Sequence, residues 1–123
     1  MTLLLVVLGA AVGAPLRYLT DLFIQSRHDF VLPWGTFTVN AAGSLVLGAT
    51  LALVDVGGAP DQLVTLVGTG FCGALTTFST FGFETVRLVE DGSLAAGALN
   101  IVVSLLVGLL AGFAGWAVVA ALV

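Results

Sequence analysis

The chain has 123 residues, of which 59% are hydrophobic and only 8% are charged, and its mean hydropathy is +1.20. An ordinary soluble domain carries about 25% charged residues, so this composition excludes a soluble protein and indicates an integral membrane protein. The net charge of -4 and the complete lack of lysine leave no basic patch for nucleic acid.

The hydrophobic segments predict an all-α membrane protein with four spanning helices. Three of them contain uncharged runs that reach the roughly 20 residues that a spanning helix needs. The first segment reaches that length only if Arg17 is satisfied inside the protein. Short loops join the segments, so we expect one four-helix domain over residues 1–123, with spans at approximately 2–24, 31–54, 62–88 and 93–121.

The first segment also has the apolar core and small residues of a signal peptide. It lacks the basic region that precedes such a core. Arg17 and Tyr18 also lie where the helix has to continue if it is to be long enough to span the membrane. We therefore expect it to be the first span. The loop after it contains His28, which we expect to be a loop residue and not a metal ligand.

Orientation in the membrane is weakly encoded. The positive-inside rule counts Lys and Arg in loops, and Arg27 is the one clear loop charge, because Arg17 and Arg87 lie in or near expected helices. Two alternatives stay open: one orientation with a weak bias, or insertion both ways, which would permit an antiparallel homodimer.

Two stripes of small and polar residues recur at four-residue spacing, which places each stripe on one helix face. Small residues let membrane helices approach closely, and polar ones at such positions point into protein. Hydrogen bonding between helices is one interpretation of the asparagines, and lining a polar path is the other. The stripes are Asn40, Ser44, Gly48 and Ala52 in the second segment, and Asn100, Ser104, Gly108 and Gly112 in the fourth.

The third segment combines glycines with four hydroxyl side chains in residues 73–82. Both features lower helix stability, so we expect this helix to break near the middle of the membrane, at residues 73–76. The carbonyls freed in broken membrane helices commonly coordinate sodium. The alternative is a kinked helix whose hydroxyls bond back to their own turn.

Phe78 and Phe81 lie three residues apart within this segment and share one helix face. They could serve packing alone, but the positive edge of a phenyl ring also attracts an anion weakly. Amide and hydroxyl donors could replace the hydration of that anion, and weak binding at several sites is what conduction requires. The segment therefore favours a permeation or binding site.

Few charged residues lie near the spans. Arg17 and Asp21, and Glu84 and Arg87, have spacings that permit pairing on one helix. Arg87 suits an anchor at the membrane surface, whereas Glu84 follows the phenylalanines and could lie in a vestibule. Cys72 is the only cysteine, which is typical of a small packing residue.

Three motifs in the chain resemble those of the Fluc family of fluoride channels, also called CrcB proteins. They are GAPLRY at residues 13–18, GTFTVNAAGS at 35–44, and GFCGALTTFSTF at 70–81, the last followed by Glu84. The third is highly specific, although Ala74 stands where the family has a glycine. The fourth segment is similar mainly through Ser104 and its glycines.

The resemblance implies a dual-topology antiparallel homodimer of four-helix subunits with two fluoride pathways. A structural sodium ion at the dimer centre would be held by the backbone carbonyls of Gly73 and Thr76. The residues that the family pattern assigns to the pathways are Asn40, Phe78, Ser79, Thr80, Phe81 and Ser104.

The function implied is passive export of fluoride across the cell inner (plasma) membrane, which would make the protein a multi-pass channel and not an enzyme. The alternative is a small proton-coupled multidrug exporter, also four-span and dual-topology. That class needs a carboxylate near the middle of the first span, and none stands there. A structural subunit would not need the hydroxyl-rich broken helix.

Overall fold

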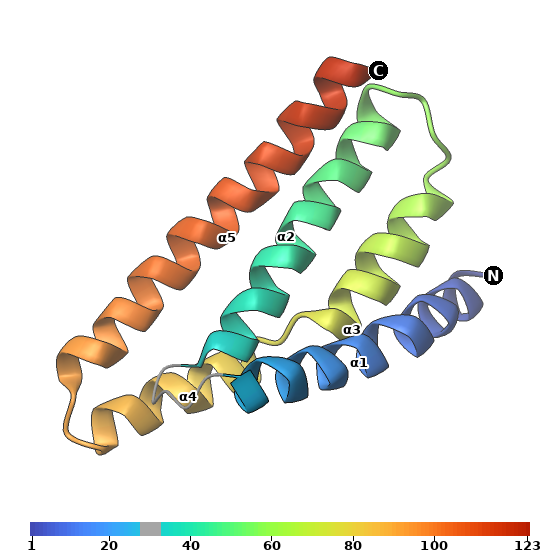
Figure 1. The fold of residues 1–123 in the computed structure, drawn as a ribbon. Helices are drawn as coiled ribbons and strands as arrows, with labels where there is room; N and C mark the ends of the chain where they lie inside the picture. The colour runs from blue at the N-terminus through green and yellow to red at the C-terminus, as the bar shows by residue number, and fades with distance from the viewer. Residues whose placement is uncertain (28–32) are drawn as a thin grey trace.

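The structure is a computed structural model that describes residues 1–27 and 33–123. Within these residues, helices are the only regular secondary structure (Figure 1). The expected start of the second span at residue 31 and the expected loop residue His28 lie outside the described part. The elements, in chain order, are α1 (Thr2–Arg27), α2 (Trp34–Asp55), η1 (Val64–Cys72), α3 (Gly73–Leu75), α4 (Ser79–Glu90) and α5 (Leu94–Leu122).

Four segments of the described chain are long and apolar enough to cross a membrane, which confirms the expected number of spans. Large apolar side chains cover their outer faces, and Leu110 and Phe113, for example, are 66% and 71% exposed. Such a surface suits lipid rather than water, so the protein is a multi-pass membrane protein. The segments are Thr2–Ile24, Trp34–Asp55, Val64–Glu90 and Leu94–Leu122.

Helices α2 and α5 run side by side along most of their length (Figure 1). Their backbones touch, because a Cβ atom added at Gly48 would collide with the carbonyl of Gly112. One added at Gly115 would collide with the carbonyl of Leu45. The four-residue stripes therefore do what small residues do in membrane bundles, which is to let two helices pack without side chains between them.

Helix α1 packs in the same way against the first half of the third span. Cβ atoms added at Gly9 or Gly13 would meet the backbone carbonyls of Leu66 and Phe71. Farther along α1, the Asp21 side chain occupies the space beside Gly35 of α2. Helix α1 thus contacts both the third span and α2.

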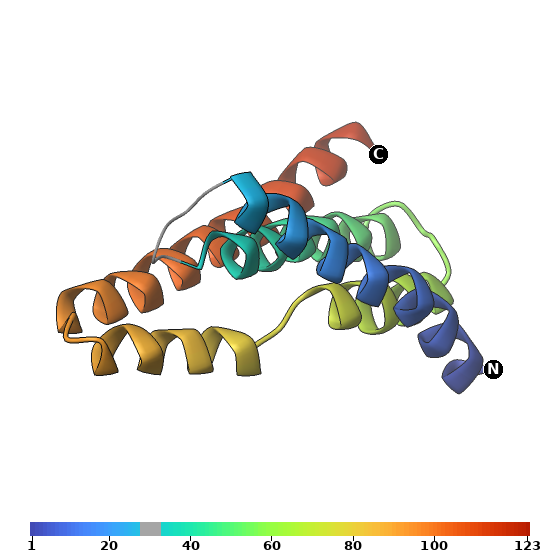
Figure 2. The ribbon, with the colours of Figure 1, turned by 60° about the horizontal axis from the view of Figure 1, so that its bottom comes forward.

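The third span is broken, as expected, and the break begins at Thr76, the last of the expected residues 73–76. Gly73 to Leu75 continue the helix as α3, and the chain becomes extended at Thr76, where φ is -83° and ψ is 161°. Figure 2 shows the extended linker that separates α3 from α4. The Gly73 N–H still bonds to carbonyls of the preceding turns, so the glycine itself does not end the helix.

The first half of the third span is a π-helix over Val64–Cys72, which sequence reasoning did not predict. Most π-helices are single turns within α-helices and occur frequently at functional sites. Here the π-helix leads directly into the break.

Helix α4 packs mainly against the first turns of α5. The two helices meet through a tight turn in which Gly92 adopts a φ of 95°, a conformation that favours glycine. Ser93 then caps α5, because its Oγ accepts the N–H of Ala96 at 3.1 Å.

Candidate functional site

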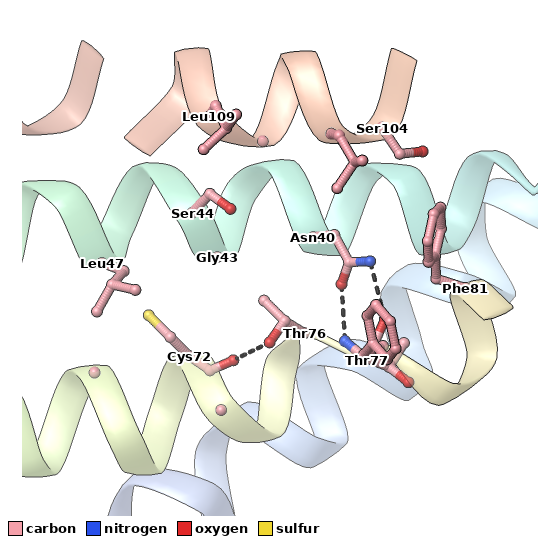
Figure 3. A pocket seen from close by; sticks show the side chains of 15 residues that line it. Asn40, Gly43, Ser44, Leu47, Cys72, Thr76, Thr77, Phe81, Ser104 and Leu109 are labelled. Carbon is pink, nitrogen blue, oxygen red and sulfur yellow. Dashed lines mark hydrogen bonds between the residues drawn. The ribbon is translucent and has the colours of Figure 1, made fainter. Parts of the chain in front are cut away.

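The linker of the third span opens onto a groove of about 440 Å³ between α2, the third span and α5 (Figure 3). None of the residues that line it carries a charged side chain. Its lining is mostly apolar, with a few amide and hydroxyl groups, which suits an ion that passes better than an ion that is held tightly. The lining residues are Asn40, Gly43, Ser44, Leu47, Gly68, Cys72, Gly73, Thr76, Thr77, Phe78, Phe81, Ser104, Leu105, Gly108 and Leu109.

Asn40 bonds to both backbone groups of Thr77 at the centre of the linker (Figure 3). Its Oδ1 accepts the Thr77 N–H at 2.8 Å, and its Nδ2 donates to the Thr77 carbonyl at 3.0 Å. A side-chain amide thus replaces the helical partners that Thr77 lacks, which buried backbone groups require. The second N–H of Nδ2 is a further donor available at the groove.

Two carbonyls at the break lose the donors that an uninterrupted helix would give them. In an α-helix the Gly73 carbonyl would accept the N–H of Thr77, but that N–H bonds to Asn40. The Thr76 carbonyl would accept the N–H of Thr80, but that N–H donates to Thr77 Oγ1 at 3.2 Å. Gly73 and Thr76 are the two residues that the resemblance assigns to sodium.

The hydroxyls at the break do not all follow one pattern. Thr76 Oγ1 donates to the Cys72 carbonyl at 2.8 Å, a bond back to its own turn. Thr77 Oγ1 donates instead to Thr80 Oγ1 at 3.0 Å, across the start of α4. The back-bonding interpretation therefore holds for Thr76, and the helix breaks all the same.

Phe78 and Phe81 both line the groove. Their ring centroids lie 5.9 Å apart with an angle of 45° between the planes, so the rings contact each other without stacking. Phe78 is 81% exposed in the single chain, whereas Phe81 is partly buried.

Ser104 brings a hydroxyl to the groove from α5. Its Oγ donates to Oδ1 of Asn100 at 3.3 Å, and Asn100 Nδ2 donates to Thr85 Oγ1 of α4 at 2.8 Å. Asn100 therefore bonds between helices, the first of its two interpretations, while Ser104 faces the groove.

The structure brings most of the expected site residues together, but not all. Ser79 and Thr80 are exposed and do not line the groove. Those that do line it are Asn40, Gly73, Thr76, Phe78, Phe81 and Ser104.

A second, polar cavity of about 190 Å³ lies on the other side of Thr77. Arg17 and Asp21 of α1 line it together with Thr80, which explains where the expected pathway residue Thr80 points. Glu84 does not line this cavity, but it bonds to a residue that does. Thr36 lines the cavity and donates to Glu84 Oε1 at 2.6 Å.

Arg87 pairs with Asp91 rather than with Glu84. The Arg87 Nε lies 4.0 Å from Asp91 Oδ2, and both side chains are largely exposed. An exposed pair of this kind contributes little to stability, which fits the interpretation of Arg87 as a surface anchor.

Among the groove residues whose side chains carry an oxygen, nitrogen or sulfur atom, sequence reasoning missed three: Ser44, Cys72 and Thr77. Ser44 lies one turn after Asn40, so the stripe in α2 held the signal for it. Thr77 stood in the hydroxyl-rich run, but only the structure identifies it as the residue that Asn40 binds.

Side chains offer no metal site within residues 1–27 and 33–123, where no cluster of three or more His, Cys, Asp or Glu residues could hold an ion. A cation near the groove would therefore depend on backbone carbonyls and hydroxyls, which suit sodium better than a transition metal.

Comparison with known proteins matches residues 4–116 to the model of the family described as "CrcB-like protein, Camphor Resistance (CrcB)". The chain belongs to the CrcB family. The resemblance inferred from the three motifs is thereby confirmed.

Relatives within this family are named fluoride-specific ion channels. A protein of Frankia casuarinae named "Fluoride-specific ion channel FluC 1" is 55% identical over 111 residues, which are 86% of each chain. One of the same name from Streptomyces avermitilis is 54% identical over 115 residues, 94% of this chain and 93% of the relative. A third, from Nocardia farcinica, is 53% identical over 100 residues, 81% of this chain and 68% of the relative.

Proposed function

We propose that this CrcB protein is a channel, and not an enzyme, that lets fluoride leave the cytoplasm passively across the plasma membrane. Fluoride enters cells as neutral HF in acidic surroundings and ionises at cytoplasmic pH, so passive efflux lowers its toxicity. The observation that carries the proposal is the uncharged, donor-lined groove at the break of the third span, in a chain 55% identical to a protein named as a fluoride-specific channel.

Fluoride is small and strongly hydrated, so a pathway has to offer close donors that offset the loss of water. Asn40 supplies an amide N–H beside the Thr77 linker. Phe78 and Phe81 supply ring edges, whose partial positive charge attracts an anion without binding it tightly. A fixed cation would hold the ion, and none lines the groove.

Hydroxyl groups continue this lining in the proposed pathway. Ser104 faces the groove from α5 and brings its hydroxyl to the path of the ion. Thr80 and Ser79 follow the linker on the first turn of α4, where they extend the donors toward the second cavity. Glu84, bonded to Thr36, lies beside that cavity as part of a vestibule.

We further propose a structural sodium ion held by the carbonyls of Gly73 and Thr76. Two hydrogen bonds support this proposal. The N–H groups of Thr77 and Thr80 bond to side chains, which leaves the Gly73 and Thr76 carbonyls without their usual helical donors. The ion would supply a fixed positive charge that keeps the broken backbone in place. One chain provides too few ligands, so the remaining carbonyls come from a second copy.

That second copy is proposed to lie antiparallel to the first. The groove has one open apolar wall, since Phe78 is 81% and Leu109 74% exposed, and a partner would close it. The weak charge bias of the loops permits insertion both ways, and a two-fold arrangement brings identical carbonyls together at its axis.

The direct test is ion efflux from liposomes that contain the purified protein. Fluoride efflux without chloride efflux is the expected result. Equal efflux of both ions, or none of fluoride, would overturn the proposed function.

The proposed topology has a separate test. Single cysteines replace Gly57 or Gly58, in the loop between α2 and η1, on a background in which Cys72 is replaced by serine. Impermeant thiol reagents are expected to label them from both sides of the membrane in cells. Labelling from one side alone would contradict dual topology and leave the fluoride proposal standing.

A further inference from the structure

A chain of three hydrogen bonds joins two walls of the groove behind its surface. Ser104 Oγ donates to Asn100 Oδ1 at 3.3 Å, and Asn100 Nδ2 donates to Thr85 Oγ1 at 2.8 Å. Thr85 Oγ1 donates in turn to the carbonyl of Phe81 at 2.8 Å. Ser104 and Phe81, the two ends, line the groove, and the two residues between them do not.

The two middle residues are buried, with exposed fractions of 9% for Asn100 and 8% for Thr85. The three hydrogen bonds run in one direction, because the Thr85 hydroxyl accepts from Asn100 and gives its one proton to the Phe81 carbonyl. Hydrogen bonds aligned in this way strengthen one another in a medium of low dielectric constant.

Helix α4 depends on α5 for its position. It has 12 residues, it follows an extended linker, and it packs far more extensively against α5 than against α2. Within the described residues, the Asn100–Thr85 bond is the one side-chain hydrogen bond between α4 and α5. It is therefore the polar contact that specifies how α4 lies along α5.

Thr50 is a buried threonine that lacks the interhelical hydrogen bond of Thr85. Thr50 of α2 is buried at 4% and also bonds back by one turn, to the Val46 carbonyl at 2.8 Å. No second helix donates a hydrogen bond to its hydroxyl in the described part of the chain. The bond within the helix is common to both threonines, so the contact from Asn100 is what distinguishes Thr85.

We propose that Asn100 and Thr85 are positioning residues of the ion pathway, which hold Phe81 on α4 level with Ser104 on α5. Neither touches the ion. They fix the backbone of Phe81, so that its ring and the Ser104 hydroxyl face the same part of the groove. This inference rests on the proposed fluoride channel and deepens it.

The first test is Thr85→Val, which keeps the shape and removes the hydroxyl. Breaking the link leaves a buried donor of Asn100 unsatisfied, so fluoride efflux per assembled channel is expected to fall about tenfold. Assembled protein is quantified by size-exclusion chromatography before reconstitution, which separates loss of folding from loss of conduction. Thr85→Ser retains the hydroxyl and is expected to restore efflux to within about twofold of the original.

Thr50→Val is the matched control. It removes a hydroxyl with the same helical bond and similar burial, at a residue that does not line the groove. Its efflux per assembled channel is expected to stay within about twofold of the original protein, because Thr50 shares no hydrogen-bond partner with Thr85.

The second variant is Asn100→Ser, which breaks the same hydrogen bond at its donor. The serine side chain is too short to reach Thr85. We expect a similar loss from it, and we expect the double variant with Thr85→Val to be no worse than either single one, since both break the same bond. Losses that multiply would show that the two residues act separately and would overturn the proposal.

Three other results would also overturn it. The first is normal efflux per channel in Thr85→Val, and the second is an equal loss in Thr50→Val. The third is a loss confined to the amount of assembled protein in both Thr85→Val and Asn100→Ser, which would make the bond structural only. An original protein that passes no fluoride would instead overturn the proposed function, so the two failures are distinguishable.

Discussion

The paired helices α2 and α5 and the third span meet at one groove, yet they are built in opposite ways. Helices α2 and α5 are continuous, and glycines bring their backbones into contact, as at Gly48 and Gly112. The third span passes through a π-helix, one α-helical turn and an extended linker before it becomes helical again.

The difference lies in how each region satisfies its backbone in lipid. A continuous helix satisfies its own N–H and carbonyl groups, so α2 and α5 can use small residues for contact alone. The broken span needs partners from elsewhere, and Asn40 of α2 supplies them to Thr77. The pair thus acts as a scaffold, and backbone groups without helical partners are available only where the third span breaks.

The largest effect is expected from disturbing the scaffold. Gly48→Ala places a methyl group against the Gly112 carbonyl, so the two helices have to separate, and such overpacking costs about 1–3 kcal/mol. We expect a lower melting temperature and a large drop in assembled protein on size-exclusion chromatography.

Gly112→Ala is the control for this prediction, because Gly112 of α5 is the residue that Gly48 of α2 contacts. A Cβ atom there would lie 3.6 Å from the Ser44 carbonyl, an ordinary distance. Near-normal assembly is expected, and equal damage from both substitutions would contradict the packing that we describe.

The next effect is expected from the bond between the scaffold and the linker. Asn40→Asp keeps an acceptor for the Thr77 N–H but loses the donor to its carbonyl, and an ionised carboxylate repels an anion. We expect assembly to persist and fluoride efflux to fall by about a hundredfold or more, the size of a buried charged mismatch of about 3 kcal/mol.

Ser44→Ala is a suitable comparison, because Ser44 lines the groove one turn away from Asn40. A smaller loss of efflux is expected from it. Normal efflux in Asn40→Asp would mean that Asn40 merely connects helices.

The smallest effect is expected from Thr76→Val. Its hydroxyl bonds back to Cys72, and the proposed sodium ligand is its carbonyl, which valine retains. Efflux within about fivefold of the original is expected, since a single hydrogen bond contributes about 1 kcal/mol or less. The measurement is made with and without sodium during reconstitution, and a lost dependence on sodium would identify the side chain as a ligand.

The sequence was informative wherever a pattern had a single physical meaning. Hydrophobic length predicted four spans, and glycine spacing predicted close helix contacts such as that of Gly48 with Gly112. The cluster of hydroxyls predicted the break, and the motif in residues 70–81 identified the family.

The remaining features depend on tertiary partners, which spacing along one helix does not reveal. The break begins at Thr76 rather than Gly73 because Asn40, 37 residues before Thr77, offers the bonds that replace the helical ones. The π-helix has no distinct hydrophobic period. Ser79 and Thr80 were assigned to the groove by family pattern, but the start of α4 directs Thr80 to the second cavity.

The central claim is that the ion passes the groove at the broken span, and two phenylalanines of α4 test it most directly. Phe81 lines the groove, whereas Phe83, two residues later, is 68% exposed and does not. Replacing either with isoleucine conserves apolar bulk and removes a ring edge. Fluoride efflux per assembled channel is expected to fall sharply in Phe81→Ile and to stay near normal in Phe83→Ile. Equal efflux in the two variants would contradict the account.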